Sequence, residues 1–160
     1  MKKSPSLAET VSPPPDAPVT RVNTRYLETL MGYNARRAAL VIIGEFLPRM
    51  AVYDLRPVDF SVLSLVVHNP GVTSRQLCAT LGMQAPNLVG MLKAMERRGW
   101  LCRRPHPHDG RAMGLHPTQA GLELMRVAEK TASDLEQKAT ADLSPEERKT
   151  LIQLLKKIYK

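Results

Sequence analysis

Several features on which large classes of protein depend are scarce in this chain of 160 residues. It has only two cysteines, Cys78 and Cys102, and no Cys-x-x-C pair, so we expect no disulfide framework and two reduced thiols. Aromatic residues make up 4% of the chain, too few for the stacking surfaces that bind single-stranded nucleic acids. These shortages disfavour a small secreted protein and a protein that binds unpaired bases.

Long apolar segments are also missing. The longest apolar run, residues 38–44, is far too short to span a bilayer and lies between Arg37 and Glu45. Lys2 and Lys3 have no apolar segment behind them, so we do not expect a secretory signal. We expect a cytoplasmic protein with no membrane contact, nucleoid-associated if its partner is DNA.

Motifs for catalysis do not stand out either. We find no nucleophile–base pair, phosphate-binding loop or paired carboxylate motif, so we expect neither an enzyme nor a cofactor. His106, His108 and His116 lie near Asp109 in the sequence, which invites a metal site. The His-x-His spacing across prolines is not typical of zinc, and we expect no metal.

Positive charge is what the chain has in excess. The formal net charge is +8, and half of it lies between residues 93 and 111, where six basic side chains stand against two acidic ones. Such an excess indicates a polyanionic partner, although composition alone does not separate DNA from RNA or from a membrane surface.

Hydrophobic residues make up 43% of the chain, and their spacing predicts a mainly helical protein. The prolines of residues 1–23 predict a disordered tail. A first helix is expected over residues 23–54, bent or ended near Pro48, and a second from Pro57 to His68. A long helix is expected from Thr118, and a final helix from about residue 144.

The middle of the chain predicts a helix-turn-helix. Thr73 and Gln76 form a capping box for a short helix that Gly82 ends. The helix after it is expected over residues 84–98, and its predicted buried face consists of Ala85, Leu88, Leu92 and Met95. Residues 100–104 and 112–116 are predicted strands, joined by a turn over residues 105–110 with Asp109-Gly110 at its corner. The expected fold class is mainly α with a β wing of two or three strands.

Four stretches resemble the MarR (multiple antibiotic resistance regulator) family of transcription factors. They are Leu81-Gly82-Met83 with the apolar positions that follow it, Glu96 to Leu101, Asp109-Gly110-Arg111, and Thr118-Gln119-Ala120-Gly121. The resemblance covers roughly residues 25–160 and implies a repressor that is released from promoter DNA by a small molecule. It implies a helical dimerisation domain over residues 24–55 and 118–160, and a winged helix-turn-helix over residues 56–117.

Apolar stripes on the first and last two helices need a second copy to cover them, so we expect a homodimer on a pseudo-palindromic duplex. The residues expected to contact DNA are Thr73, Ser74, Arg75, Gln84, Pro86, Asn87, Gly90, Arg97, Arg103, Asp109 and Arg111. Arg111 is expected to enter the minor groove, held by Asp109, while Asn87 and Gln84 contact adenine edges. The alternatives are an incidental ion pair at the turn, a helix cap at Thr73, and solvated surface charges.

The resemblance also implies an effector, and aromatic acids are the class that the family often binds. We expect its pocket near Asn34, Arg37, Arg49, Tyr53 and Phe60, with an arginine pairing to a carboxylate. Alternatively, Arg49 forms an i, i+4 pair with Glu45, and Asn34 sets helix register.

Two other functions stay open from the sequence. One is a regulator switched by oxidation of Cys102 or Cys78, although no resolving partner is evident. The other is an architectural protein that binds duplexes by charge and shape, and such a protein would bind all duplexes with nearly equal affinity.

Overall fold

The structure is a computed structural model that describes residues 21–106 and 109–159, with only the backbone described at residues 106 and 109–112. The tail expected over residues 1–23 therefore lies almost wholly outside the described residues. The chain divides into two compact units, one ending at Arg36 and one beginning at Arg37.

The first unit contains a short helix and the start of a long one. Helix α1 spans Arg25–Glu28 and helix α2 spans Met31–Met50, so the single helix expected over residues 23–54 is wrong at this point. The hydroxyl of Thr29 donates to the carbonyl of Tyr26 at 2.7 Å, a local bond that competes with continuation of the helix. The side-chain amide of Asn34 donates to the carbonyls of Glu28 and Leu30, both at 2.8 Å, and so satisfies the backbone at the break.

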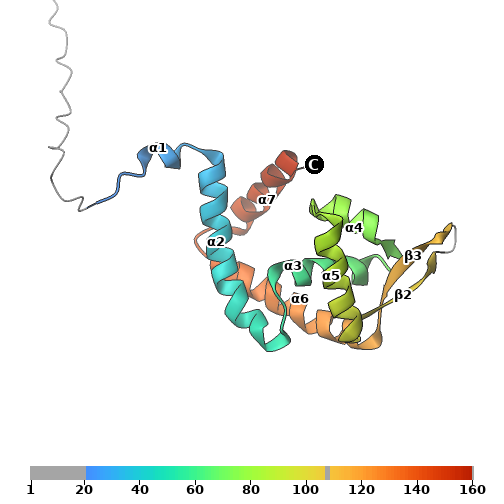
Figure 1. Cartoon of the computed structure of the whole chain (residues 1–160). Coiled ribbons are helices and arrows are strands. Elements are labelled where there is room, and N and C mark those ends of the chain that lie inside the picture. The colour runs from blue at the N-terminus through green and yellow to red at the C-terminus, as the bar shows by residue number, and fades with distance from the viewer. Residues whose placement is uncertain (1–20, 107–108, 160) are drawn as a thin grey trace, which may run out of the picture. The chain divides into compact units, whose positions relative to one another are not determined.

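The second unit contains the remainder of α2 and all later elements (Figure 1). These are a 3-10 turn η1 at Ala51–Tyr53, α3 at Pro57–His68, β1 at Val72–Thr73, α4 at Ser74–Leu81, α5 at Ala85–Arg97, β2 at Leu101–His106, β3 at Asp109–Pro117, α6 at Gln119–Ala139 and α7 at Pro145–Tyr159. Helix α2 includes Pro48 and ends two residues after it, as expected. Pro57 occupies the first turn of α3, where a missing N–H costs nothing.

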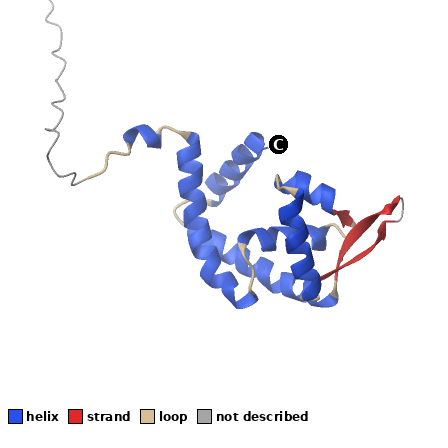
Figure 2. Cartoon of the chain, viewed as in Figure 1, coloured by secondary structure: helices blue, strands red, loops and turns tan. Residues whose placement is uncertain are grey.

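The three strands form one antiparallel sheet in the order β1-β3-β2 (Figure 2). Val72 pairs with Leu115, and Arg103 pairs with Leu115 from the other side. His106 pairs with Asp109, so the strands continue past the expected ends and the hairpin corner is not Asp109-Gly110. The turn therefore lies within the predicted residues 105–110, but strand pairing extends past Pro105, where the strand was expected to have ended.

The core of this unit lies where α3, α4, α5 and α6 meet the sheet. Its fully buried side chains include Met50, Leu63, Leu77, Leu88, Leu92, Leu115, Met125 and Leu135. Helices α3 and α6 pack against each other, and α4 packs against α5. This packing holds α5 from its inner side and leaves its outer side free to meet a partner.

Thr118 and Gly121 join the sheet to α6. The Thr118 hydroxyl accepts from the Gly121 N–H at 3.1 Å and donates to the Gly99 carbonyl, while the Thr118 N–H donates to the Trp100 carbonyl at 3.1 Å. A Cβ on Gly121 would lie 2.0 Å from the Trp100 carbonyl oxygen, so no larger residue fits. The Thr-x-x-Gly spacing is thus a packing requirement at the base of the hairpin.

Helix α7 begins with a capping box formed by Ser144 and Glu147. The Ser144 N–H donates to the Glu147 carboxylate at 2.9 Å, and the Glu147 N–H donates to the Ser144 hydroxyl at 3.3 Å. No residue of Pro145–Tyr159 is buried. Among residues 21–106 and 109–159, no helix combines the length and hydropathy that a membrane crossing requires.

Candidate nucleic-acid interface

Helices α4 and α5 are joined by a tight turn at Gly82. Gly82 adopts the left-handed conformation, with φ of 61°, and its N–H donates to the Cys78 carbonyl. The Met83 N–H also donates to the Cys78 carbonyl, at 3.0 Å. This arrangement ends α4 as predicted, and α5 starts three residues after Gly82, at Ala85, which gives a helix-turn-helix.

The inner and outer faces of α5 differ clearly. Leu88, Leu92 and Met95 are buried as predicted, whereas Ala85, which was expected on the same face, is exposed. Ala85 is the first residue of the helix, where the chain is still leaving the turn. The expected contact residues Gln84, Pro86, Asn87 and Gly90 are all exposed.

One exposed stripe of α5 carries positive charge, and only part of this charge belongs to the residues expected to contact DNA. Pro86, Gly90, Lys93 and Arg97 follow one another at helical spacing, and all four are exposed. A Cβ on Gly90 would have no heavy atom within 4 Å, so the backbone here is open to close approach. Lys93 was counted in the basic segment but not among the contacts, and its spacing from Gly90 was the signal that could have identified it.

The start of α4 contributes a capped helix N-terminus. The Thr73 hydroxyl accepts from the Gln76 N–H at 3.3 Å and donates to the Gln76 side-chain oxygen at 2.8 Å. The Thr73 N–H donates to the same oxygen at 2.9 Å. The predicted capping box is therefore confirmed, and the Thr73 hydroxyl is committed to it. Ser74 is half-buried and Arg75 is exposed.

The hairpin of β2 and β3 is tied to α5 by an ion pair. Arg103 on β2 donates from Nε to the Glu96 carboxylate at 2.9 Å, and both side chains are about one-third exposed. Arg104, the next residue, is exposed. The side chains of Asp109 and Arg111 lie outside the described residues, and only their backbone positions on β3 are known.

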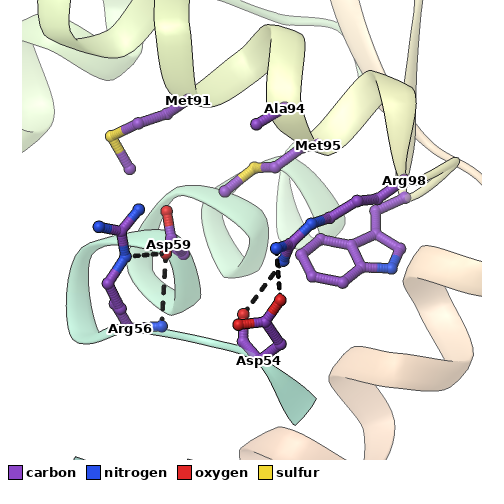
Figure 3. Close-up of a pocket in the computed structure, with 8 residues that line it drawn as sticks. Asp54, Arg56, Asp59, Met91, Ala94, Met95 and Arg98 are labelled. Carbon is purple, nitrogen blue, oxygen red and sulfur yellow. Dashed lines mark hydrogen bonds and ion pairs between the residues drawn. The ribbon is translucent and has the colours of Figure 1, made fainter. Parts of the chain in front are cut away.

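A cavity of about 320 Å³ lies beside the inner edge of α5 (Figure 3). Asp54 and Arg98 pair across it, and Arg56 donates from Nε to Asp59 at 3.0 Å. The guanidinium of Arg98 also lies over the Trp100 ring, 4.7 Å from its centroid. Nothing in the sequence placed Asp54 beside Arg98, because 44 residues separate them.

The structure gives most of the expected effector residues local partners. In the second unit, the Tyr53 hydroxyl lies 3.1 Å from that of Thr131, and Phe60 packs edge-on against Phe46 at 5.6 Å. Arg49 lies 3.7 Å from Glu45, and Arg37 is exposed. Phe60 lines a hollow that it shares with Ser64 and Glu129. Asn34 belongs to the first unit.

The two cysteines occupy different elements. Cys78 lies on α4 and Cys102 on β2, and both are half-buried free thiols. Cys102 pairs in the sheet with His116 of β3, whose ring would lie 3.7 Å from a Cβ on Gly71.

A helix-turn-helix followed by an antiparallel hairpin with a third short strand is the winged helix-turn-helix of DNA-binding regulators. A family model described as the MarR family matches residues 53–112. The chain belongs to the MarR family of transcription regulators.

Known relatives agree with this assignment. The multiple antibiotic resistance protein MarR of Salmonella typhimurium is 30% identical over 66% of this chain and 74% of its own length. The transcriptional repressor CouR, solved with a 23-mer DNA duplex, is 34% identical with a TM-score of 0.81 and covers 88% of this chain and 100% of its own. A CouR from Rhodococcus jostii RHA1, solved with p-coumaroyl-CoA, is 23% identical with a TM-score of 0.77 and covers 83% and 94%. The expected family and fold class are therefore confirmed.

Proposed function

We propose that the chain is a repressor that binds a pseudo-palindromic promoter site as a homodimer and is released by a small-molecule effector. The observation that carries this proposal is the outer face of α5, which is exposed from Gln84 to Arg97 and ends in Lys93 and Arg97. A helix of this kind fits the major groove, where side chains can contact base edges. The repressor CouR, which is similar to this chain, was solved on a DNA duplex.

The hairpin is proposed to contact the flanking minor groove. Arg111 lies near its end, and a guanidinium is attracted to the negative potential of a narrow minor groove. Asp109 is proposed to orient that guanidinium. The N-terminus of α4, with Ser74 and Arg75, is proposed to contact a phosphate and so fix the register of the protein on the duplex.

Exposed apolar side chains support a dimer built from residues 24–55 and 118–160. On the part of α2 in the second unit they are Leu40, Val41, Ile43 and Leu47, and on α7 they are Leu151, Ile152, Leu154, Ile158 and Tyr159. A monomer in water rarely exposes so many large apolar residues on neighbouring turns of a helix. A second copy that covers them would place two α5 helices on one side, about one helical turn of DNA apart.

The effector is proposed to be a small aromatic acid or its thioester. The Rhodococcus jostii CouR was solved with p-coumaroyl-CoA, which contains such an aryl group. The residues proposed to contact the effector are Tyr53, Phe60, Arg49, Arg37 and Asn34. An effector releases DNA only if it binds the free arrangement of the two lobes better than the DNA-bound one.

The test is a footprint on the DNA that flanks the gene of this chain, followed by anisotropy titrations on the protected duplex. Arg111→Ala is expected to weaken binding by about tenfold or more. It is also expected to lower the salt slope, the steepness with which the logarithm of the affinity falls with the logarithm of the salt concentration, by about one. Arg126→Ala is the matched control, because Arg126 is an exposed cation on α6 and the variant loses the same charge.

Equal losses in the two variants would contradict the role of Arg111. Equal affinity for the protected duplex and a scrambled duplex at fixed salt would favour an architectural protein instead. Added p-coumarate or p-coumaroyl-CoA is expected to raise the Kd, and a Kd unchanged by either compound would remove the proposed effector class.

A further inference from the structure

Asp54 marks the corner at which η1 ends and the chain turns toward α3. It adopts the left-handed conformation, with φ of 52°, and is the one non-glycine residue in that conformation among residues 21–106 and 109–159. Its N–H donates to the Ala51 carbonyl at 3.0 Å, which closes the turn. The corner therefore directs both the carbonyl and the carboxylate of Asp54 at a single neighbour.

That neighbour is Arg98, the residue that caps the C-terminal end of α5. Its Nη1 donates to the Asp54 carbonyl at 3.1 Å, and its Nη2 donates to the Asp54 carboxylate. The guanidinium also lies over the Trp100 ring. One side chain thus has three points of attachment, and the ring below it limits the rotamers that it can adopt.

This geometry distinguishes the pair from an ordinary surface ion pair. Exposed pairs contribute little, because two flexible side chains must be ordered to form them. Here one acceptor is a backbone carbonyl, and the guanidinium is held against a ring, so less conformational freedom is lost. Asp54 itself is 81% exposed at the side chain, which means that the pair does not serve to bury a charge.

The position of the pair connects two parts of the chain. Arg98 follows the last residue of α5, and Asp54 follows the turn that ends α2. Two residues before Arg98, Glu96 pairs with Arg103 of the hairpin. The C-terminal end of α5 is therefore linked both to the hairpin and to the corner before α3, while Arg97 between these links stays exposed.

We propose that Arg98 is a positioning residue, which uses its contacts with Asp54 and Trp100 to hold α5 in the orientation that binds DNA. This inference rests on the proposed function and adds a residue that does not itself contact DNA. When the contact with Asp54 is lost, α5 samples more orientations, and the measured affinity falls with the fraction of competent protein. A dimer has two such contacts, so the losses multiply.

The decisive variant is Asp54→Asn. Asparagine tolerates the left-handed conformation and keeps the carbonyl acceptor, so the corner is preserved while the charge is removed. Removing a negative charge from a DNA-binding protein ordinarily strengthens its binding to the polyanion. Only a positioning role predicts the opposite, a Kd for the footprinted duplex that rises by about threefold to tenfold.

Arg98→Gln is expected to raise the Kd by a similar factor and to leave the salt slope unchanged, because no phosphate contact is lost. The double variant is expected to bind no more weakly than either single variant, since both remove one interaction. Arg98→Lys keeps the charge but not the forked donor geometry, and we expect it to restore part of the affinity. Arg126→Ala again controls for the loss of a positive charge.

Several results would overturn the proposal. One is an Asp54→Asn protein that binds DNA as tightly as the parent or more tightly, and another is additive losses of affinity in the double variant. A third is a salt slope lowered by about one in Arg98→Gln, which would make Arg98 a direct phosphate contact. Equal melting temperatures for parent and variants, measured by circular dichroism, separate positioning from loss of folding. If the parent chain binds no duplex, the proposed function itself fails. If the parent binds and Asp54→Asn does not weaken it, only the positioning role fails.

Discussion

Gly121→Ala is expected to destabilise the fold strongly, although it adds only a methyl group in the first turn of α6. The added Cβ would lie 2.0 Å from the Trp100 carbonyl oxygen and 3.0 Å from its carbonyl carbon. Because Cβ atoms essentially never approach within 3.0 Å of another atom, the start of α6 must retreat by about 1 Å. The contact atoms are backbone, so no side chain can move aside instead.

The magnitude follows from what that retreat breaks. Overpacking of this kind costs about 1–3 kcal/mol. The retreat also stretches the bonds from Thr118 to the Trp100 and Gly99 carbonyls, each with a net contribution of about 1 kcal/mol. We expect a loss of about 3 kcal/mol in the free energy of unfolding and roughly 10 °C in Tm.

Urea unfolding followed by far-ultraviolet circular dichroism measures this loss. Protein concentration is held fixed, because the stability of the proposed dimer would depend on it. The control is Gly90→Ala, where the added Cβ meets nothing within 4 Å and the helix gains about 0.5–1 kcal/mol. A Gly121→Ala protein within about 0.5 kcal/mol of the parent would refute the argument from close approach.

Three further predictions concern stability. Thr73→Ala is expected to cost about 1 kcal/mol in urea unfolding because the cap on α4 is lost, and Thr73→Ser is expected to restore most of it; equal losses in both would contradict the capping role. Leu92→Ala, at a fully buried position, is expected to cost about 2–5 kcal/mol, and a loss below about 1 kcal/mol would show that α5 is not held from this side. The Ser144 N–H and then its hydroxyl hold the pKa of Glu147 below its ordinary value, so the stabilisation from this cap is present above the ordinary glutamate pKa and is lost as the pH falls through the lowered one. Titration of the Glu147 carboxyl by nuclear magnetic resonance measures this pKa, and a pKa at or above the ordinary value would contradict the prediction. Glu147→Gln is expected to flatten the pH dependence of the stability of α7 below about pH 4.3.

The sequence identified those elements whose boundaries are set by local chemistry. Pro57 starts α3, the Thr73 and Gln76 pair starts α4, and Gly82 ends it, each at the predicted position. Thr118 likewise caps α6 with its hydroxyl. These signals work because the hydrogen bonds that carry them lie within a few residues of one another.

Expectations failed where strand pairing or packing outweighs the local sequence signal. The strands run past the expected turn because pairing of His106 with Asp109 outweighs the local preference of the proline before it. Leu122 lies three residues before the fully buried Met125, so helical spacing predicts that it is buried too, but it is 41% exposed.

The candidate site shows the same division. The exposed face of α5 could be predicted from the spacing of Leu88, Leu92 and Met95, because a helix with one buried side must expose the other. The pairing of Arg103 with Glu96 could not be predicted, since the sequence does not distinguish Glu96 from any other nearby acidic residue as the partner. The link from Arg98 to Asp54 depends on two elements meeting in space, and on a backbone conformation that aspartate rarely adopts.

The short strand β1 has a consequence for the length of the DNA site. It joins the start of α4 to β3, through the pairing of Val72 with Leu115 and a bond of 2.7 Å from the Gly71 N–H to the Leu115 carbonyl. A Cβ on Gly114 would lie 2.9 Å from the Gly71 carbonyl oxygen, so the two chains run in close contact at this point. The helix-turn-helix and the hairpin are therefore joined as one body, which would fix the number of base pairs between their proposed contacts within each half-site. If the chain binds DNA as the proposed dimer, variation in operator length has to fall at the centre of the palindrome, between the two protomers.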